Sequence, residues 1–348
     1  MADLTVFGGG SWGTALAASA ASSGHSVCLW CRRSEQARAI NASGTNPDYL
    51  REISLPAGIS ATPDITEAAL HSHYWILALP TQTLRGFLPA LESFCTDRTE
   101  ICNVAKGIEI DTGKRISEIV GEILPRALYS VLSGPSFAEE VARGLPTAVT
   151  VASGKDGSAL FWQSLLNTTR LRLYTSHDVT GTETGGAVKN IMAIASGLAS
   201  SLGLGDNARA ALVSRGLAEI MRFGEALGAH PLTLAGLAGM GDLVLTCYST
   251  QSRNFRLGMA LGRGLSLEEA RTEIGQVAEG AFTVRAVTEA ARKLSVDMPI
   301  SRGVHRLLYE GASPAEELER LLTRDPKAEY PPAILWGSSS CPEKESGV

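Results

Sequence analysis

Lys189 and Asn190 stand in a stretch of otherwise apolar and small residues, GAVKNIMAIASG, whose apolar positions recur at helical spacing. An amine in such surroundings loses hydration, and its pKa falls toward the range that is useful for proton transfer. The alternative is a lysine whose stem packs on the protein while its amine reaches solvent. Lys189 is therefore a candidate acid–base group.

Two other polar residues follow strand-like runs. Lys106 ends the apolar run in EICNVAKG, and Ser136 follows the run in YSVLSGPS. Ligands of open α/β sheets bind at the carboxyl edge of the strands, so both side chains are candidates for ligand contact. A strand-end lysine is also common as a structural or solvated residue. Ser136 and Glu139 have the spacing of a capping box, which predicts a helix N-terminus that could attract an anion or simply be capped by Ser136.

A further polar cluster lies in GLAGMGDLVLTCYSTQSRNFRLG. Asp242 stands between glycines and an apolar run, and Ser252, Arg253 and Asn254 precede a predicted helix. Together these residues offer one carboxylate and several groups that donate hydrogen bonds to a phosphate. The alternatives are a helix cap at Asp242 and a surface charge at Arg253.

The stretch VFGGGSWGTA has the spacing G-x-G-x-x-G at Gly8, Gly10 and Gly13, between a predicted strand and a predicted helix. In a dinucleotide-binding fold the first glycine makes the tight turn. The second lets a pyrophosphate approach the backbone, and the third lets the helix pack close to the strand. The helix N-terminus presents free N–H groups to the phosphates. This loop predicts a dinucleotide site.

The end of the second predicted strand bears on which dinucleotide binds. A site that prefers NAD usually carries a carboxylate there, which accepts from the ribose 2′-hydroxyl. This chain has Arg32 and Arg33 instead. Guanidinium groups form bidentate bonds to a phosphate, so the pair favours the 2′-phosphate of NADP(H). The alternative is a solvated turn with two exposed arginines.

Strands and helices alternate through the first half of the chain. The strand-like runs are LTVFG, SVCLW, YWILALP, EICNVAKG, YSVLSGP and TAVTVAS, and helical stretches include 14–23, 65–70 and 116–123. This alternation predicts a parallel, doubly wound sheet with helices on both faces. After about residue 173 the apolar spacing becomes helical, and capping boxes begin SLEEARTEI and SPAEELERLL. We expect an α/β domain at 1–183, an all-α domain at 184–332 and a disordered tail at 333–348.

Composition narrows the class of protein. The chain has 348 residues and a net charge of −5, which argues against a nucleic-acid partner. Its apolar runs are shorter than the roughly 20 residues that span a bilayer, and its first residues lack the pattern of a secretory signal. We therefore expect a cytoplasmic protein with no membrane partner.

Cysteine and histidine usage gives no sign of a metal or disulfide site. The six cysteines mostly lie beside apolar neighbours, as reduced thiols of a cytosolic protein do. Cys28 and Cys31 form a C-x-x-C within a predicted strand, where they would point to opposite faces, so we expect core packing rather than redox chemistry. The six histidines show no ligand spacing, and we expect no metal.

Several motifs together resemble one family, the bacterial NAD(P)-dependent glycerol-3-phosphate dehydrogenases. They are GGGSWGTALA, LSGPSFA, GAVKNIMAIASG, GDNARAALVSRGL, GLAGMGD, SRNFRLG and VAEG, which occur in the family's order over roughly residues 3–330. The resemblance implies an N-terminal Rossmann domain. It also implies a helical C-terminal domain like that of 6-phosphogluconate dehydrogenase.

The resemblance also implies a role for individual residues. Cofactor contacts fall on Gly8, Gly10, Ser11, Trp12, Gly13, Arg32, Arg33, Lys106, Ala138, Arg253, Val277 and Glu279. Substrate contacts fall on Lys106, Gly134, Ser136, Lys189, Asp242, Ser252, Arg253 and Asn254. Lys189 is the implied proton carrier.

The implied reaction is the reversible reduction of dihydroxyacetone phosphate to sn-glycerol 3-phosphate for glycerolipid synthesis. NADPH is the expected cofactor, with NADH as the alternative, and a homodimer is one expected assembly. A β-hydroxyacid dehydrogenase or a ketopantoate reductase is the nearest alternative, because those enzymes use a comparable lysine on carboxylate substrates. A nicotinamide sensor without turnover is disfavoured by the acidic net charge and the lack of a helix-turn-helix beside a basic run.

Overall fold

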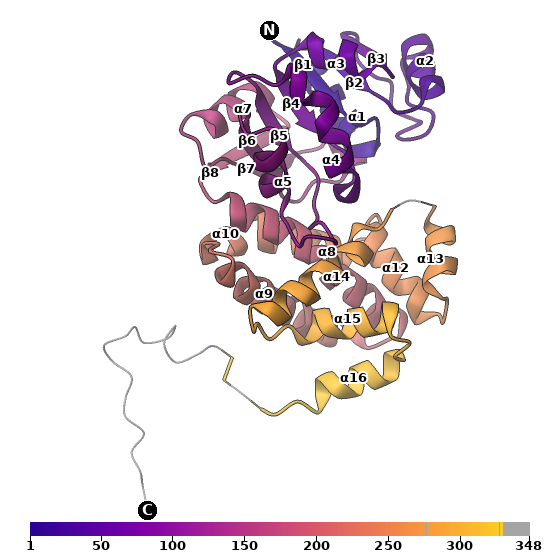
Figure 1. Cartoon of the computed structure of the whole chain (residues 1–348). Coiled ribbons are helices and arrows are strands. Elements are labelled where there is room, and N and C mark those ends of the chain that lie inside the picture. Colours follow the sequence, from indigo (N-terminus) through magenta and orange to yellow (C-terminus); the bar gives the residue numbers. More distant parts are fainter. Residues whose placement is uncertain (276, 327, 330–348) are drawn as a thin grey trace, which may run out of the picture.

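The computed structural model describes residues 1–275, 277–326 and 328–329. A sheet domain with flanking helices lies above a domain made of helices in the view of Figure 1. The long helix α8 (Val179–Ser201) is the first element of the helical domain and lies beside the sheet domain. This arrangement confirms the expected α/β domain followed by an all-α domain.

The sheet has eight strands in the described residues, in the order β3-β2-β1-β4-β5-β6-β7-β8. The strands are β1 (Asp3–Phe7), β2 (Ser26–Trp30), β3 (Ile59–Thr62), β4 (Tyr74–Leu77), β5 (Glu100–Asn103), β6 (Leu128–Ser133), β7 (Thr147–Ala152) and β8 (Leu171–Ser176). The order 3-2-1-4-5-6 is that of a dinucleotide-binding sheet, in which the strand order reverses beside β1.

The sheet beyond β6 differs from the predicted parallel arrangement. Strands β1 to β6 are mutually parallel, but β7 pairs antiparallel with β6 while β8 runs parallel to β7. Strands β3 and β8 were absent from the predicted set. Both alternate polar and apolar residues, as in Leu171-Arg172-Leu173-Tyr174 of β8, so they lack the continuous apolar run that marks a buried strand.

Helices cover both faces of the sheet, as predicted. They are α1 (Ser11–Ser22), α2 (Ser34–Ser43), α3 (Ile65–His71), α4 (Thr81–Phe87), the 3₁₀ helix η1 (Leu88–Phe94), α5 (Ile116–Ile123), α6 (Ala138–Ala142) and α7 (Ser158–Leu166). Leu4 and Val6 of β1 join one apolar core, with Trp162 of α7. Phe7 joins the core on the other face, with Trp75 of β4. Alternate residues of a strand point to opposite faces, so β1 feeds both cores.

The helical domain is packed around α8. Its other elements are α9 (Gly205–Ala226), α10 (Pro231–Ala235), the π-helical turn η2 (Leu237–Gly241), α11 (Asp242–Tyr248), α12 (Arg253–Gly262), α13 (Leu267–Ile274), α14 (Glu279–Lys293), α15 (Pro299–Tyr309) and α16 (Pro314–Leu322). Helix α8 is buried along nearly its whole length. It crosses α12 closely, because a Cβ at Gly197 would lie 2.0 Å from the Phe255 carbonyl oxygen and one at Gly258 1.9 Å from that of Ile194.

The structure can be compared with several local features that the sequence predicts. Capping boxes begin α13 at Ser266 and α16 at Ser313, as predicted. Cys28 and Cys31 are buried and free, and burial raises the pKa of each thiol, to about 11 and about 12. The expected domain boundary between residues 183 and 184 falls within α8, and the tail expected at 333–348 lies outside the described residues.

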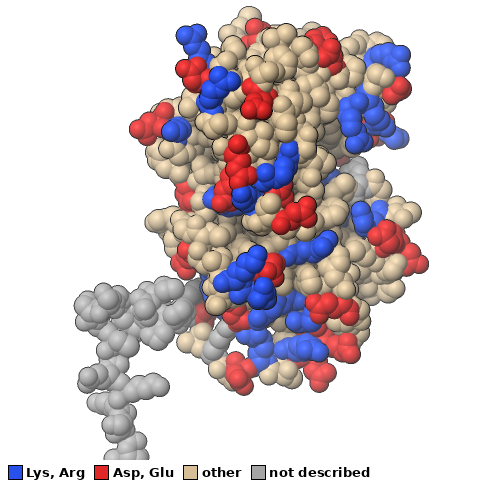
Figure 2. Space-filling model, in the orientation of Figure 1, with Lys and Arg blue, Asp and Glu red and all other residues tan. Residues whose placement is uncertain are grey.

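Basic and acidic side chains are interspersed over the face seen in Figure 2. One described stretch, Pro231–Tyr248, has the length and the mean hydropathy (1.2) of a membrane span. It is divided into α10, η2 and α11, however, and it contains the charged and 1% exposed Asp242. Length and composition alone are therefore weak evidence for a span here.

Candidate active site

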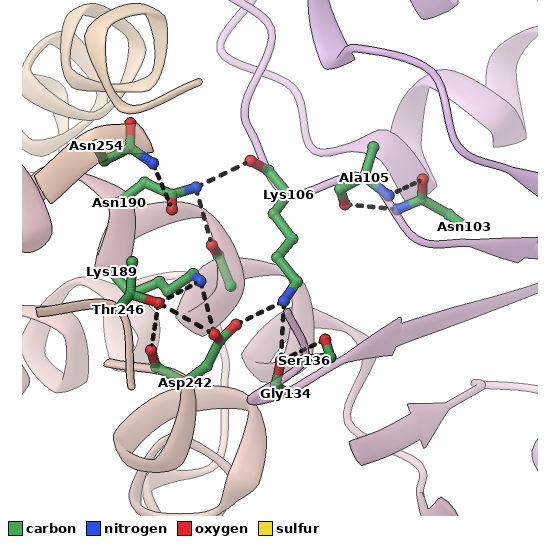
Figure 3. A network of polar contacts seen from close by, with 11 residues as sticks. Asn103, Ala105, Lys106, Gly134, Ser136, Lys189, Asn190, Asp242, Thr246 and Asn254 are labelled. Carbon is green, nitrogen blue, oxygen red and sulfur yellow. Dashed lines mark hydrogen bonds and ion pairs between the residues drawn. The ribbon is translucent and has the colours of Figure 1, made fainter. Parts of the chain in front are cut away.

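Lys189 is buried in the middle of α8, with 6% of its surface exposed. Its Nζ donates to Asp242 Oδ1 at 2.6 Å and to Thr246 Oγ1 at 2.7 Å (Figure 3). Burial lowers the pKa of Lys189 to about 8, although Asp242 opposes that effect, and the nearby Lys106 ammonium lowers it further. The alternative of an amine that reaches solvent is therefore wrong.

Asp242 joins two amines that come from the two domains. Its Oδ2 accepts from Lys106 Nζ at 2.7 Å, and the same amine donates to the Gly134 carbonyl oxygen at 2.9 Å. Burial alone would raise the pKa of Asp242, but the two ammonium groups hold it below its usual value. Lys106 follows β5 and Gly134 follows β6, so the carboxyl edge of the sheet contributes directly to this cluster.

Glycines allow close contacts in the segment that precedes Asp242. A Cβ at Gly185 of α8 would lie 2.7 Å from the Ala238 carbonyl oxygen of η2, and one at Gly239 of η2 would lie 1.9 Å from the Leu234 carbonyl oxygen of α10. Only bare backbone fits at these contacts. Asp242 then begins α11, and Thr246 lies one turn further along the same face, where its hydroxyl donates to the Asp242 carbonyl oxygen at 2.6 Å.

The turn after β6 differs from the prediction. Helix α6 begins at Ala138 with Phe137 as its N-cap, so the alternative in which Ser136 caps this helix is wrong. Ser136 Oγ instead donates to the Gly134 carbonyl oxygen at 2.9 Å. Gly134 has φ +143°, and a Cβ there would lie 3.0 Å from Val149 Cα, so the turn requires glycine.

A pair of amides extends the network toward α14. Asn254 Nδ2 donates to Asn190 Oδ1 at 2.9 Å, and Asn254 Oδ1 accepts from the Gly280 N–H at 2.9 Å. Asn190 Nδ2 in turn donates to the Lys106 carbonyl oxygen at 3.4 Å (Figure 3). These bonds tie α8, α12 and α14 to the loop that carries Lys106.

Ser252 and Arg253 lie at the start of α12. Ser252 Oγ caps the helix by accepting from the Phe255 N–H. Desolvation by the surrounding protein lowers the pKa of Arg253, although the residue remains exposed to solvent. Within the described residues its guanidinium makes no hydrogen bond or ion pair, and its donors are available to an anion.

Glu279 begins α14 and lies against the sheet domain. Its Oε1 accepts from the Thr81 N–H at 3.2 Å, at the start of α4. Its Oε2 and the Thr81 hydroxyl are both buried without a hydrogen-bond partner in the described residues. Burial raises the pKa of Glu279, and Arg253 opposes that effect. Val277 is 43% exposed just before this helix.

The glycine loop has the geometry that was predicted. Gly8 has φ +128°, and a Cβ there would lie 2.5 Å from the Ala78 carbonyl oxygen. A Cβ at Gly13 would lie 1.9 Å from the Gly8 carbonyl oxygen, whereas one at Gly10 would have no protein atom within 4 Å. The space over Gly10 is therefore open while the other two positions are closed.

Other features of the loop also fit a dinucleotide phosphate. Helix α1 begins at Ser11 without a side-chain cap, which leaves its first N–H groups available to an anion. Trp12 Nε1 is buried with no partner in the described residues. Gln36 and Asn46 hold the loop by donating to the Gly9 carbonyl oxygen at 2.6 and 3.0 Å.

The two arginines after β2 are not equivalent. Arg33 is ion-paired with Asp48 at 2.5 Å, with half of its side chain exposed. Arg32 is exposed, and its guanidinium has no ion pair in the part of the chain that is described. Both residues lie just after β2. Of the two, Arg33 is already paired with a carboxylate, whereas the guanidinium of Arg32 is available to a phosphate.

Comparison with known proteins identifies the family. Residues 3–159 match the family described as NAD-dependent glycerol-3-phosphate dehydrogenase N-terminus, and residues 178–319 match its C-terminus. The chain belongs to the NAD-dependent glycerol-3-phosphate dehydrogenase family.

Several bacterial proteins named glycerol-3-phosphate dehydrogenase are similar to this chain. Glycerol-3-phosphate dehydrogenase (NAD(P)+) of Thioalkalivibrio sulfidiphilus is 47% identical over 94% of this chain and 98% of its own. The first such enzyme of Salinibacter ruber is 45% identical over 94% and 97%. The crystal structure of glycerol-3-phosphate dehydrogenase from Coxiella burnetii is 38% identical, with a TM-score of 0.90 over 92% of this chain and 99% of its own.

Sequence reasoning missed some residues of this glycerol-3-phosphate dehydrogenase site. Thr246 contacts Lys189, Thr81 contacts Glu279, and Gln36 and Asn46 hold the glycine loop. The spacing of Thr246, four residues after Asp242, could have placed both on one helical face. The other three had no local signal, because their partners are distant in sequence.

Proposed function

We propose that this protein catalyses the reversible reduction of dihydroxyacetone phosphate to sn-glycerol 3-phosphate, with NADPH preferred over NADH. The observation that carries the proposal is the buried Lys189 amine, with a pKa of about 8, held by Asp242 in a chain of this family. An amine with that pKa exchanges protons readily near neutral pH.

The glycine loop and its neighbours would hold the dinucleotide. Gly8, Gly10, Ser11, Trp12 and Gly13 would bind the phosphates, and Arg32 and Arg33 would bind the 2′-phosphate. When bound, the reduced dinucleotide supplies the hydride to C2 of the substrate. Ala138, Val277, Glu279 and Arg253 are the further cofactor contacts that we propose.

Lys189 would handle the proton at Nζ. In the direction of reduction, its ammonium donates a proton to the oxygen on C2 as negative charge develops there. In the direction of oxidation, its neutral amine removes the hydroxyl proton. Positioned proton transfer of this kind contributes roughly 100- to 10,000-fold in rate. Asp242 and Thr246 fix the direction in which Nζ points.

The substrate's phosphate would bind away from the reacting carbon. Arg253, Ser252 and the remaining N–H of Asn254 lie at the N-terminus of α12, which favours an anion. Lys106, Gly134 and Ser136 would contact the triose part from the sheet edge. Binding the remote phosphate orients C2 and converts affinity into rate.

We also propose a biological setting for this activity. The protein would work in the cytoplasm, supply glycerolipid synthesis, and act on a small molecule without a nucleic-acid or membrane partner. Its small-residue helices would allow a homodimer. We also propose that the sheet domain, expected at 1–183, holds the cofactor and that the helical domain, expected at 184–332, holds the substrate, with the whole of α8 belonging to the helical domain.

A single assay tests this function. Purified protein is mixed with NADPH or NADH and with dihydroxyacetone phosphate, ketopantoate or a semialdehyde acid, and the loss of reduced cofactor is followed by absorbance. We expect turnover with dihydroxyacetone phosphate and a preference for NADPH. Turnover confined to the carboxylates would favour the ketopantoate reductase alternative. The solved ketopantoate reductase from Ralstonia eutropha shares only the fold, at 14% identity and a TM-score of 0.58.

A further inference from the structure

Glu183 is a buried carboxylate that the proposed reaction does not use. It lies in the second turn of α8 and is 7% exposed. Its Oε1 accepts from the Ser117 N–H at 2.8 Å and from the Tyr129 hydroxyl at 2.6 Å. Its Oε2 accepts from Ser117 Oγ at 2.6 Å and from the Arg115 guanidinium at 3.0 Å. All four donors belong to the sheet domain.

The site that receives this carboxylate is the N-terminus of α5. Arg115 is the N-cap of that helix and Ser117 its second residue. A helix N-terminus has unpaired N–H groups and a partial positive charge, both of which favour a carboxylate. Arg115 also donates to Thr180 Oγ1 of α8 at 3.1 Å. A side chain of one domain thus caps a helix of the other.

Glu183 stands at the head of one face of α8. Residues 183, 186 and 190 are spaced three and four apart, so they share that face. A Cβ at Gly186 would lie 2.5 Å from Ser133 Oγ and 3.5 Å from Lys106 Cγ. Asn190 donates to the Lys106 carbonyl oxygen. This face is therefore in contact with the sheet domain from Tyr129 near the start of β6 to Lys106.

We propose that Glu183 is a positioning residue, whose carboxylate holds α8 against the sheet domain and thereby keeps the Lys106 amine beside Asp242 and Lys189. The proposal rests on the proposed function, since it concerns the same proton-transferring amine. Of Glu183, Gly186 and Asn190, only Glu183 is charged, and its four donors make it the strongest attachment among the three residues.

Loosening the contact between this face of α8 and the sheet domain should raise the pKa of Lys189. The charged and titratable groups that face Lys189 are Asp242 and Cys247 from α11 and Lys106 from the loop after β5. Only Lys106 comes from the sheet domain. If α8 moves away from that domain, Lys189 loses a neighbouring positive charge and some burial. Both losses favour the ammonium form, so the pKa of Lys189 rises.

The first variant is Glu183→Gln, which keeps the size of the side chain but removes its charge and points an amide N–H₂ at donors. We expect kcat for glycerol 3-phosphate oxidation to fall about tenfold to a hundredfold, as small misplacements of a reacting group do. We also expect the midpoint of the pH–kcat profile to move up by about one pH unit. Glu183→Asp keeps the charge, so its kcat and its pH midpoint should lie closer to the wild-type values than those of Glu183→Gln.

Glu219→Gln is the matched control. Glu219 is also a buried carboxylate, 1% exposed, and it also caps a helix, because it accepts from the Ile300 N–H at 2.5 Å and from the Ser301 N–H at 3.1 Å at the start of α15. Both of its partners lie within the helical domain. We expect Glu219→Gln to lower Tm but to leave the pH midpoint where the wild type has it.

Tyr129→Phe gives a second, milder arm, because it removes one donor and leaves the carboxylate. It should move the midpoint in the same direction by less, and it decides the matter if Glu183→Gln does not fold. An unchanged midpoint and kcat in the folded variants, or an equal shift in Glu219→Gln, overturns the proposal. Wild-type turnover, measured in the same series, separates that outcome from failure of the proposed function.

Discussion

The glycine loop and the cluster of Lys106, Lys189 and Asp242 are built from different parts of the chain and by different interactions. The loop uses backbone from within six residues, Gly8 to Gly13, and its fit is a matter of absent side chains. The cluster uses charged side chains, with Lys106 and Asp242 136 residues apart and Lys189 and Asp242 53 apart. One site depends on local geometry, whereas the other depends on how two domains meet.

The two sites are sensitive to different kinds of substitution. A steric site fails when an atom is added, because backbone in contact with backbone cannot move away. An electrostatic site fails when a charge is removed, because the partner charge is left buried. Changes of the two kinds should therefore separate cofactor binding from chemistry.

Lys189→Ala should have the largest effect on turnover. Without the amine, kcat should fall by roughly 100- to 10,000-fold, while the dissociation constant for NADPH stays near that of the wild type. Steady-state kinetics and fluorescence titration with NADPH measure the two quantities. Lys155→Ala, at an exposed lysine beyond β7, is the control. Normal turnover in Lys189→Ala would remove the amine from the mechanism.

Gly13→Ala should produce the converse result. The added Cβ would lie 1.9 Å from the Gly8 carbonyl oxygen, and strain of this kind costs about 1–3 kcal/mol. We expect NADPH affinity to fall about tenfold to a hundredfold. Gly121→Ala, in α5 with no atom within 4 Å of the new Cβ, should leave affinity unchanged. Equal NADPH affinity in the two variants would show that the contact at Gly13 does not shape the cofactor site.

Gly10→Ala separates strain within the protein from steric exclusion of the cofactor. The new Cβ meets no protein atom within 4 Å, so Tm should stay near the wild-type value. A pyrophosphate that approaches Gly10 would collide with the methyl group, however, and NADPH binding should weaken. If calorimetry shows wild-type affinity, the phosphates do not pass over Gly10.

The pH dependence of the reaction should follow the Lys189 amine. Oxidation of glycerol 3-phosphate needs the neutral amine, so below the pKa of about 8 its kcat should fall about tenfold per pH unit. Reduction needs the ammonium and should fall above that pH. Asp242→Asn removes the carboxylate that holds the pKa up, so its midpoint should move down. An upward move would show that Asp242 does not stabilise the ammonium.

The smallest effect concerns the choice of cofactor. Arg32→Ala should raise the Kd for NADPH about tenfold and leave that for NADH unchanged, because a charge-assisted bond to the 2′-phosphate is lost. Arg33→Ala should do less, since Arg33 is already paired with Asp48. Arg38→Ala, at an exposed residue of α2, is the control. Equal NADPH to NADH ratios in all three would show that these arginines are bystanders.

Local signals predicted the parts of this molecule that are local in structure. The glycine loop, the helical second half and the capping boxes of α13 and α16 are read from residues a few positions apart. Strand β3, strand β8 and the reversal of β7 were missed, because direction depends on which strands pair, and a short alternating run does not encode its neighbours. At Ser136 the spacing of a capping box is present, but the Ser136 hydroxyl donates to the Gly134 carbonyl oxygen and does not cap the helix.

The candidate site was predicted residue by residue but not as an arrangement. Lys106, Lys189 and Asp242 each stood out as a polar group among apolar neighbours. Nothing in the sequence indicated that one carboxylate would hold both amines, nor that Thr81 would meet Glu279. The sequence also did not show that Asp242 would lie beside Lys189 and oppose the effect of burial on its pKa. In the structure burial has the larger effect and lowers the pKa of Lys189 to about 8. Burial could not be judged from the sequence, because several helices together enclose the amine.

The continuity of α8 has a consequence for variation in chain length. From Val179 to Lys189 this helix has no loop that could absorb an inserted or deleted residue. One extra residue would turn everything beyond it by about 100° and advance it by about 1.5 Å, which carries the amine off its face. The distance in sequence between the end of the sheet and Lys189 is therefore set by helical pitch, and a designer of chimaeric enzymes should join the halves elsewhere.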